Sequence, residues 1–523
     1  MRDAGAAWGI ALATVGVLAW LALVSAYGPF TVDDTFISLR YAEHVARGIG
    51  PTWNEHGPRA EGYTSPLWIA VLATAAWVAP DLELAAKALS VLAALGAIAV
   101  TGALAWSLCA RREPGERAVA AGLAVLTIGA APATAIHAVS GMETALAMLL
   151  AAGYALAISE LLRVSDGAHA LGPRCAVAAG LGLALSLTRP EANLVVALTS
   201  LLVLAQLPCV ARRRFAVAVL ALHAVPGALY FAWRVDYYGQ LLPLPFYVKA
   251  VMPGAVLPGA AEALAFARAS WVERIDVGIA VVVAVVALRG RALVLAIPAL
   301  ALWLFWFVPA HEMGYDFRYF QPLLPPLIAL AAAGAITIRE GTGKAAVMIP
   351  AIAIAGSILA PAPWLARSIE EKRGYAAGIA RAHAPIGHAL GSIRSEVRRP
   401  VLASLDAGAI AFHSRWEVID TWGLNDAIIA TRGERDAGYV LAQDPSVVIV
   451  ISARADRFEP CFEHEQALWD GARALGLAHV ASFEFLPDYH LFLLAREGAP
   501  ESEALIAASQ AGASDRSPIA RAR

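Results

Sequence analysis

Long apolar runs follow one another along most of this chain, and they restrict it to folds that cross a membrane. Runs of about 17 to 25 apolar residues are long enough, as helices, to cross a hydrocarbon core of about 30 Å. Hydrophobic residues make up 59% of the 523 residues and charged residues only 16%, a balance unlike that of a soluble domain. We predict crossings at 8–27, 84–108, 118–138, 142–162, 174–189, 191–208, 213–233, 275–289, 291–309, 322–338 and 344–361. The chain is therefore predicted to contain a polytopic α-helical membrane domain.

The positively charged residues predict the orientation of these helices. Lys and Arg are enriched in cytoplasmic loops, and here they gather in alternate short loops at 111–117, 163–174, 212–214, 289–291 and 339–344. Placing these loops in the cytoplasm also puts the N-terminus there, provided that the short apolar stretch 66–79 is re-entrant or interfacial. No clear cleavage site follows 8–27, so we interpret it as a retained helix and not a signal peptide. The loop 28–65 and everything after 361 are then predicted to lie on the outer side.

After Trp364 the composition becomes that of an ordinary globular protein. A charged helical stretch at 366–398 precedes β-rich runs, which we expect to form strands at 401–405, 409–412, 447–452, 480–486 and 489–495. The sequence thus predicts a transmembrane domain over 1–361 and a soluble C-terminal α/β domain over 362–496. Residues 497–523 are mainly Ala, Ser, Gly and charged residues, and they are predicted to form a disordered tail.

Charge and cysteine content exclude several classes of protein. A net charge of −2 gives no basis for binding nucleic acid. The cysteines are scattered without CxxC or Cys/His spacing, so neither a disulfide framework nor a metal site is predicted: Cys109, Cys175, Cys209 and Cys461. His137 and His311 could form a metal pair, but a single histidine near a helix end is usually just hydrogen-bonded. We expect neither a metal nor a cofactor.

The first polar segment contains two adjacent carboxylates, Asp33 and Asp34. From Phe36 onward the pattern predicts an interfacial helix with the carboxylates at its N-terminus. In one interpretation, one carboxylate caps this helix and the other favours its dipole. In the other, one is a general base that removes a proton from a hydroxyl group while its neighbour orients it or binds the substrate.

Three basic residues, Arg189, Lys249 and Arg318, lie in segments predicted to be on the outer side. Each could simply snorkel or pack at a helix end. Together they could instead bind a lipid phosphate, since preplaced cations stabilise the negative charge that a departing phosphate gains. Glu143 and Glu191, each next to a predicted crossing, could pair with these bases or bind ligand hydroxyl groups.

Several motifs give the chain a resemblance to a known family. Residues 33–68 combine the acidic pair with the sequence Phe-Ile-Ser-Leu-Arg-Tyr-Ala and the block Glu-Gly-Tyr-Thr-Ser-Pro-Leu-Trp. Further motifs lie at 140–144, 188–191, 237–249, 406–408 and 423–426. With these motifs the chain resembles membrane glycosyltransferases of the C-type fold, most closely the mycobacterial terminal β-(1→2)-arabinofuranosyltransferase family, over nearly its whole length.

The resemblance implies transfer of a sugar from a polyprenyl-phosphate donor to a glycan or glycolipid acceptor of the cell envelope. Asp33 or Asp34 would be the catalytic base, and the donor phosphate would bind Arg189, Lys249 and Arg318. We expect sugar or acceptor contacts from Arg40, Glu61, Tyr63, Glu143, Glu191, Tyr238 and His311. The reaction would occur on the outer face of a bacterial inner membrane, with the periplasmic C-terminal domain helping to bind the acceptor.

Other functions remain open at this point. A lipid-linked sugar transporter or flippase would carry its polar residues near the bilayer midplane, whereas here they gather at the outer rim. A structural or sensory protein would use the outer domain to bind a ligand and would not need Asp33 or Asp34. Among enzymes, the alternative is a protein glycosyltransferase of the same fold.

Overall fold

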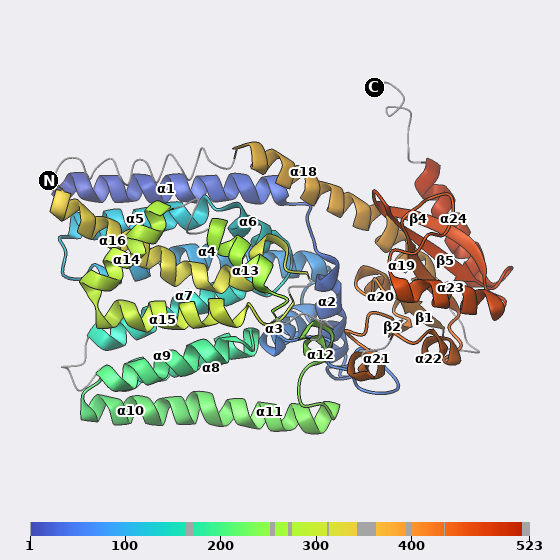
Figure 1. Ribbon diagram of the computed structural model, residues 1–523, viewed down its shortest axis with the longest axis horizontal. Coiled ribbons are helices and arrows are strands. Elements are labelled where there is room, and N and C mark those ends of the chain that lie inside the picture. The colour runs from blue at the N-terminus through green and yellow to red at the C-terminus, as the bar shows by residue number, and fades with distance from the viewer. Residues whose placement is uncertain are drawn as a thin grey trace.

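The computed structural model describes residues 2–163, 171–250, 257–269, 275–310, 313–342, 362–393, 400–432 and 435–514. One part of the molecule is a bundle of helices, and the other is a domain of strands and helices at one end of that bundle (Figure 1). The two parts meet at α2, Asp33–Ala46. The predicted fold class, a helical membrane domain followed by a small α/β domain, is confirmed.

The remaining helices of the bundle follow the apolar runs of the sequence. They are α1 (Arg2–Tyr27), α3 (Pro66–Ala76), α4 (Leu82–Leu108), α5 (Pro114–Gly129), α6 (Pro132–Val139), α7 (Thr144–Arg163), α8 (Leu171–Thr188), α9 (Ala192–Gln206), α10 (Cys209–Val219), η1 (Leu220–Ala224), α11 (Val225–Tyr238), α12 (Leu244–Ala250), α13 (Ala260–Ala267), α14 (Ile275–Leu288), α15 (Gly290–Phe305), η3 (Tyr315–Leu323) and α16 (Leu324–Thr342).

The length and composition of these helices fit a protein that crosses the membrane several times. Within the described residues, 6 helices are long and apolar enough to cross, and α5 with α6, bent by 62°, would make a further crossing. The helices α9, α14 and α15 have 15, 14 and 16 residues and are shorter than predicted. The predicted crossing 344–361 lies outside the described residues. The number of crossings and their orientation therefore stay predictions.

Helix α3 covers the stretch 66–79, whose status decides the predicted topology. It has 11 residues. At a rise of 1.5 Å per residue it is about 17 Å long, roughly half of the hydrocarbon thickness. Its length therefore fits a re-entrant or interfacial helix.

Glycines hold α1 against α5 at short range. A Cβ atom at Gly122 would lie 2.3 Å from the carbonyl oxygen of Gly9, and one at Gly129 would lie 2.5 Å from that of Gly16. Small residues allow helix backbones to approach closely inside a membrane. This contact fixes α1, and the chain passes from α1 through residues 28–32 into α2.

The C-terminal domain contains a mixed sheet with the strand order β2-β1-β3-β5-β4. Its strands are β1 (Val401–Ser404), β2 (Glu417–Asp420), β3 (Val447–Ser452), β4 (Ala478–Leu486) and β5 (Tyr489–Ala495). Strand β1 is parallel to β2 and β3, and β5 is antiparallel to β3 and β4. The helical elements of this half of the chain are α18 (Ala362–Gly378), η5 (Ile379–His383), α19 (Ala384–Gly391), α20 (Ala409–Ser414), α21 (Ala427–Arg432), α22 (Ala437–Ala442), α23 (Glu463–Ala474) and α24 (Pro500–Ser514).

Two secondary-structure predictions in this domain are wrong. The expected strand 409–412 is the helix α20, because the backbone N–H groups of Gly408 and Ala409 donate to the carboxylate of Asp33, which caps the start of the helix. Strand β2 was not predicted, since only Val418 and Ile419 lie between its charged ends and two apolar residues form no recognisable pattern.

The predicted disordered tail is also wrong over most of its length. Residues Pro500–Ser514 form the helix α24, and its Leu505 is fully buried against the core of the C-terminal domain. Buried apolar area therefore stabilises a segment whose composition alone suggested disorder. Residues 515–523 lie outside the described part of the chain.

Helix α2 was predicted to lie at the membrane surface as an interfacial helix. In the structure it is buried on most of its surface. It packs between α3 of the bundle and α20 of the C-terminal domain (Figure 1). Arg40 is 3% exposed, and its guanidinium donates to the carbonyl oxygens of Trp53 at 2.7 Å, Ala411 at 2.5 Å and Trp416 at 2.6 Å. These bonds compensate the guanidinium for lost hydration. Arg40 thus joins the two domains.

We expect Arg40→Met to lower the free energy of unfolding by about 3 kcal/mol, because carbonyl oxygens at the junction would lose their donors while remaining buried. Thermal unfolding followed by tryptophan fluorescence would measure the loss. Arg415→Met is the matched control, since Arg415 is 71% exposed and its pair with Glu43 should contribute less than about 1 kcal/mol. Equal effects of the two changes would contradict this role for Arg40.

Glu465 of α23 gives the C-terminal domain a pH-dependent stability. Burial raises the pKa of Glu465 to about 8, although its Oε1 accepts a hydrogen bond from the N–H of Ile451 at 2.8 Å. A carboxyl group whose pKa is raised on folding stabilises the protein at low pH, and this contribution is lost as the pH rises through 8. Glu465→Gln keeps an acceptor for Ile451 without the charge. We expect the variant to lose less stability than the wild type between pH 5 and 9, by about 1 kcal/mol or more. Melting temperatures of the two proteins that fall equally with pH would contradict this.

Candidate active site

A cavity of about 300 Å³ lies where the bundle meets the C-terminal domain. Its walls come from α2, the segment before α3, the turns between α6 and α7 and between α8 and α9, α12, the end of α15 and η3. Leu424, from the loop after β2, closes it on the side of the C-terminal domain. Segments that are separated by up to several hundred residues therefore build one site.

The two carboxylates at the start of α2 have different surroundings. Asp34 lines the cavity, and its Oδ2 lies 3.9 Å from Nη1 of Arg318. Asp33 points to the C-terminal domain, where its carboxylate accepts hydrogen bonds from the N–H groups of Gly408 at 3.0 Å and Ala409 at 2.8 Å. Successive residues of a helix point about 100° apart, which separates the two side chains. Of the predicted pair, the structure brings only Asp34 into the cavity.

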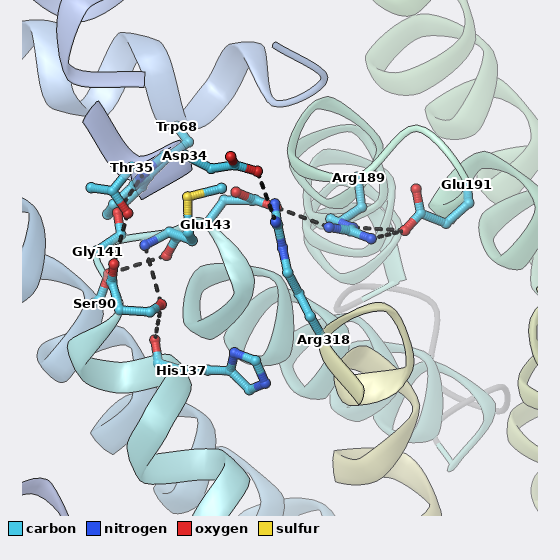
Figure 2. Close-up of polar contacts among 12 residues, drawn as sticks. Asp34, Thr35, Trp68, Ser90, His137, Gly141, Glu143, Arg189, Glu191 and Arg318 are labelled. Atoms are coloured by element: carbon cyan, nitrogen blue, oxygen red, sulfur yellow. Dashed lines mark hydrogen bonds and ion pairs between the residues drawn. The ribbon is translucent and has the colours of Figure 1, made fainter. Parts of the chain in front are cut away.

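Beside Asp34 lies a row of alternating charges (Figure 2). Glu143 accepts from Arg189 and from Arg318, each at 2.9 Å. Arg189 also pairs with Glu191 at 2.6 Å. The side chains of both arginines and of both glutamates are less than a tenth exposed. Of the two roles considered for Glu143 and Glu191, the structure shows the pairing with the basic residues, and sugar binding stays a prediction.

Glu143 stays ionised between the arginines. The guanidinium groups of Arg318 and Arg189 both lie 2.9 Å from its carboxylate, and their positive charges favour the ionised form. Its carboxylate can therefore accept hydrogen bonds but cannot act as a base near neutral pH. Glu143 holds the two guanidinium groups in position.

Arg318 retains unused hydrogen-bonding capacity in the wall of the cavity. It donates to Glu143 through Nη2, whereas its buried Nε and Nη1 have no hydrogen-bond partner among the described residues. Leaving charged donors unsatisfied in a buried position is costly. By contrast, Arg189 uses Nε for Glu191 and Nη1 for Glu143. Of the two arginines, Arg318 is therefore the one with two guanidinium nitrogens that have no hydrogen-bond partner among the described residues.

The position of Arg318 depends on an unusual backbone. The two preceding residues, Asp316 and Phe317, have φ values of 48° and 56°, which are rare for residues other than glycine. Lys372 of α18 binds the Asp316 carboxylate at 2.9 Å and helps to hold this turn. Strain of this kind is maintained where the surrounding structure requires it, and here it turns Arg318 toward Glu143 and Asp34.

An apolar wall and one more cation complete the cavity. Lys249 at the end of α12 lines it, as predicted, and so do Phe246, Trp306 and Val308. Val308 is 57% exposed on the surface of the bundle, so this wall continues to the outside. A ligand with a charged group and a long apolar part fits such a lining.

Other predicted site residues lie elsewhere. Arg40 joins the domains, and Glu61 is bound to Arg234 in a buried ion pair that lines a neighbouring cavity. Tyr63 lines the site, but its hydroxyl bonds to that of Tyr238 at 3.0 Å, and Tyr238 itself donates to a backbone carbonyl. Arg40, Glu61 and Tyr238 therefore do not line this cavity, although sugar or acceptor contacts were expected from them. His311 lies outside the described residues.

Several residues of the cavity were not predicted. The side chains of Ser38, Met142, Trp306, Tyr319 and Leu424 all line it. Ser38 follows one turn after Asp34, and Tyr319 directly follows Arg318, so helix periodicity and sequence proximity could have indicated them. Nothing in the sequence marks Trp306, which reaches the cavity only through the packing of α15.

Metal ligands do not gather in this region. Across the parts of the chain that the structure describes, no group of three or more His, Cys, Asp or Glu side chains could hold a metal ion. A requirement for a metal or a cofactor therefore stays untested.

The chain is similar to known proteins mainly in its structure. Residues 378–513 match a family described as Domain of unknown function (DUF8728), and no curated protein matches by sequence. ArnT from Cupriavidus metallidurans bound to undecaprenyl phosphate has a TM-score of 0.60 and 14% identity, covering 94% of this chain and 99% of its own. Its apo state has the same TM-score and identity, with 97% and 99% covered. The archaeal oligosaccharyltransferase AglB from Archaeoglobus fulgidus, in complex with an inhibitory peptide and a dolichol-phosphate, has a TM-score of 0.51 and 11% identity, covering 84% and 69%.

These proteins are glycosyltransferases of the GT-C class, and the similarity extends along almost the whole chain. The chain therefore has the GT-C fold, a multi-helix membrane domain that carries a C-terminal α/β domain. The resemblance to the arabinofuranosyltransferase family is a finer statement that these comparisons leave open.

Proposed function

We propose that the protein is an inverting glycosyltransferase that moves a sugar from a polyprenyl-phosphate donor to a hydroxyl group of a cell-envelope glycan or lipid. The observation that carries the proposal is the juxtaposition of Asp34 with Arg318, whose buried Nε and Nη1 have no hydrogen-bond partner among the described residues. A carboxylate and an anion-binding guanidinium 3.9 Å apart in one cavity suit a reaction in which a proton is removed while a phosphate departs.

In this proposal Asp34 accepts the proton of the acceptor hydroxyl group. The acceptor oxygen forms a bond to the anomeric carbon, and the bond from that carbon to the phosphate oxygen breaks. The electron pair of the broken bond stays on polyprenyl phosphate, which gains negative charge. Because attack occurs opposite the leaving group, the configuration at the anomeric carbon is inverted.

The positive side chains stabilise this departing charge. Arg318 offers two guanidinium nitrogens, and Lys249 lines the same cavity. Charge-assisted hydrogen bonds in a water-poor site are stronger than those in bulk water. Arg189 keeps Glu143 and Glu191 in place, and Glu191 with Tyr63 can contact sugar hydroxyl groups from the wall of the cavity.

The bound ligands of the similar structures support a polyprenyl-phosphate donor. ArnT was solved with undecaprenyl phosphate and AglB with a dolichol-phosphate. We extend the proposal to a multi-pass enzyme of a bacterial inner membrane, with the site and the C-terminal domain outside the cytoplasm and no metal or cofactor in the reaction. Arabinofuranose is our first candidate for the sugar, because of the family resemblance. Transfer to a protein acceptor is the alternative within the fold, and a flippase is the alternative outside enzymes.

Incubating the purified protein with a panel of polyprenyl-phosphate sugars and membrane glycolipids tests the proposal. We expect one donor, with arabinofuranose tested first, to give free polyprenyl phosphate and a glycosylated acceptor in equal amounts. Donor movement between leaflets of a vesicle without cleavage would instead support the flippase. Absence of both cleavage and donor binding across the panel would overturn the proposal.

A further inference from the structure

A second cavity of about 470 Å³ lies beside the candidate active site, between α8 and the π-helical turn η1 with the helix α11 that follows it. The two cavities share lining residues Thr64, Pro190 and Phe246. They are therefore adjacent parts of one surface and are separated only by these side chains.

This cavity opens toward the membrane. Its outer wall belongs to the 30-residue span Cys209–Tyr238, in which only Ala211, Phe215, Arg234 and Tyr238 are buried. Phe231 lines the cavity and is 44% exposed. Leu183 and Leu187 of α8 form the opposite wall. A hydrocarbon chain can enter such a space sideways from the bilayer.

Two residues in the wall of the cavity carry polar atoms without a partner, and such atoms distinguish between kinds of hydrocarbon chain. Ser186 lines it and is 8% exposed, and its Oγ has no hydrogen-bond partner among the described residues. His223 also lines it, and its Nδ1 is buried and equally without a partner there. A prenyl chain has no polar atoms and would leave both groups unsatisfied, which is unfavourable for buried polar groups. An ester or amide carbonyl of an acyl chain would accept a hydrogen bond from the Ser186 hydroxyl group, and one from His223 in the tautomer that carries its proton on Nδ1.

The depth of Ser186 fits such a carbonyl. It lies three residues before Arg189, and a rise of 1.5 Å per residue places it about 4.5 Å below the charged row of the active site. In an acylated lipid the carbonyl groups lie directly below the head group. A lipid with its carbonyl at Ser186 would therefore extend its head group past Thr64 and Phe246 toward Asp34.

We propose that this second cavity binds the acyl chain of a membrane-anchored acceptor glycolipid, so that donor and acceptor reach the active site from different sides. The acceptor role of this lipid rests on the proposed function, because its head group would carry the hydroxyl group that Asp34 deprotonates. The binding of an acylated lipid itself does not depend on catalysis and can be measured separately.

Filling the cavity tests the inference. A Cβ atom at Gly227 would meet only Leu183, at 3.8 Å, so Gly227→Leu places a side chain in the cavity without a backbone clash. Leu229→Phe is the matched control, since Leu229 lies on the same helix and is 67% exposed. The full chain is reconstituted with two probes, a phosphatidylglycerol that carries a diazirine in one acyl chain and a photoreactive polyprenyl phosphate.

We expect the phosphatidylglycerol probe to label peptides of α8 and α11 in the wild type. Labelling should fall by roughly 5-fold or more in Gly227→Leu, because the new side chain fills the binding space, and should not change in Leu229→Phe. Labelling by the polyprenyl phosphate should be unchanged in both variants. Equal phosphatidylglycerol labelling in all three proteins would mean contact with bulk lipid only and would overturn the inference, as would loss of polyprenyl phosphate labelling in Gly227→Leu. If no donor is cleaved but the acyl probe behaves as expected, the proposed function fails and the lipid site stands.

Discussion

Replacing Asp34 with asparagine should lower the rate of sugar transfer by about 10²- to 10⁴-fold, the usual contribution of a general base. Asparagine has nearly the same shape but cannot accept the proton. Asp34 is also the only carboxylate of the acidic pair that lines the cavity. Binding of polyprenyl phosphate should change little or even improve, since a negative charge 3.9 Å from Arg318 is removed. Single-turnover rates and donor binding, measured on the same preparation, separate the two effects.

Asp33→Asn is the matched control, because it makes the same chemical change one residue away. It retains one side-chain oxygen to accept from Gly408 or Ala409 and should reduce stability by about 1 to 2 kcal/mol while keeping most of the transfer rate. If Asp33→Asn, correctly folded, were as inactive as Asp34→Asn, the assignment of the base to Asp34 would be wrong. Full activity in both variants would exclude either carboxylate as the base.

Replacing Arg318 with glutamine should weaken polyprenyl phosphate binding by about 10- to 100-fold, because a charge-assisted contact of about 1.5 to 3 kcal/mol is lost. The transfer rate at saturating donor should fall as well, since the same guanidinium would stabilise the phosphate as it departs. Lipid-linked donor binding can be followed by the quenching of tryptophan fluorescence, to which Trp306 in the cavity wall should contribute.

The change at Arg318 also leaves Glu143 with one cation fewer, so a compensated variant is needed. Arg318→Gln combined with Glu143→Gln removes one charge of each sign and should recover much of the stability lost by the single change. We expect donor binding to stay weak in the double variant. Recovery of donor binding together with stability would mean that Arg318 acts only through its ion pair.

The membrane domain was predictable because lipid requires long apolar helices, and such helices are visible in any sequence that forms them. Four of the five strands were predictable for a similar reason, since a buried strand such as β3 is apolar at every position except its last, Ser452. The short strand β2 and the helices α20 and α24 were not, because their conformation depends on neighbours that are distant in the chain. The capping of α20 by Asp33 is the clearest case, with about 375 residues between the partners.

The composition of the site was partly predictable, but its arrangement was not. Charged residues at the ends of apolar helices indicated Arg189, Glu143 and Glu191, since such residues are costly near a membrane. The sequence could not separate Asp33 from Asp34, because the difference lies in where the C-terminal domain docks. It also could not show the left-handed turn at Asp316 that aims Arg318, since no glycine marks it. Arg40 was predicted to contact the substrate because the sequence around it does not show that its side chain is buried between the two domains.

The capping of α20 by Asp33 has a consequence for how this protein can be divided or recombined. Asp33 of α2 binds the C-terminal domain while the next residue, Asp34, lines the cavity, so a shift of the docked domain would move Asp34 through a single peptide unit. The two domains therefore cannot be exchanged freely between proteins. A chimaera with a foreign C-terminal domain would need backbone groups that match Asp33 and Arg40, or Asp34 would be displaced from its position in the cavity.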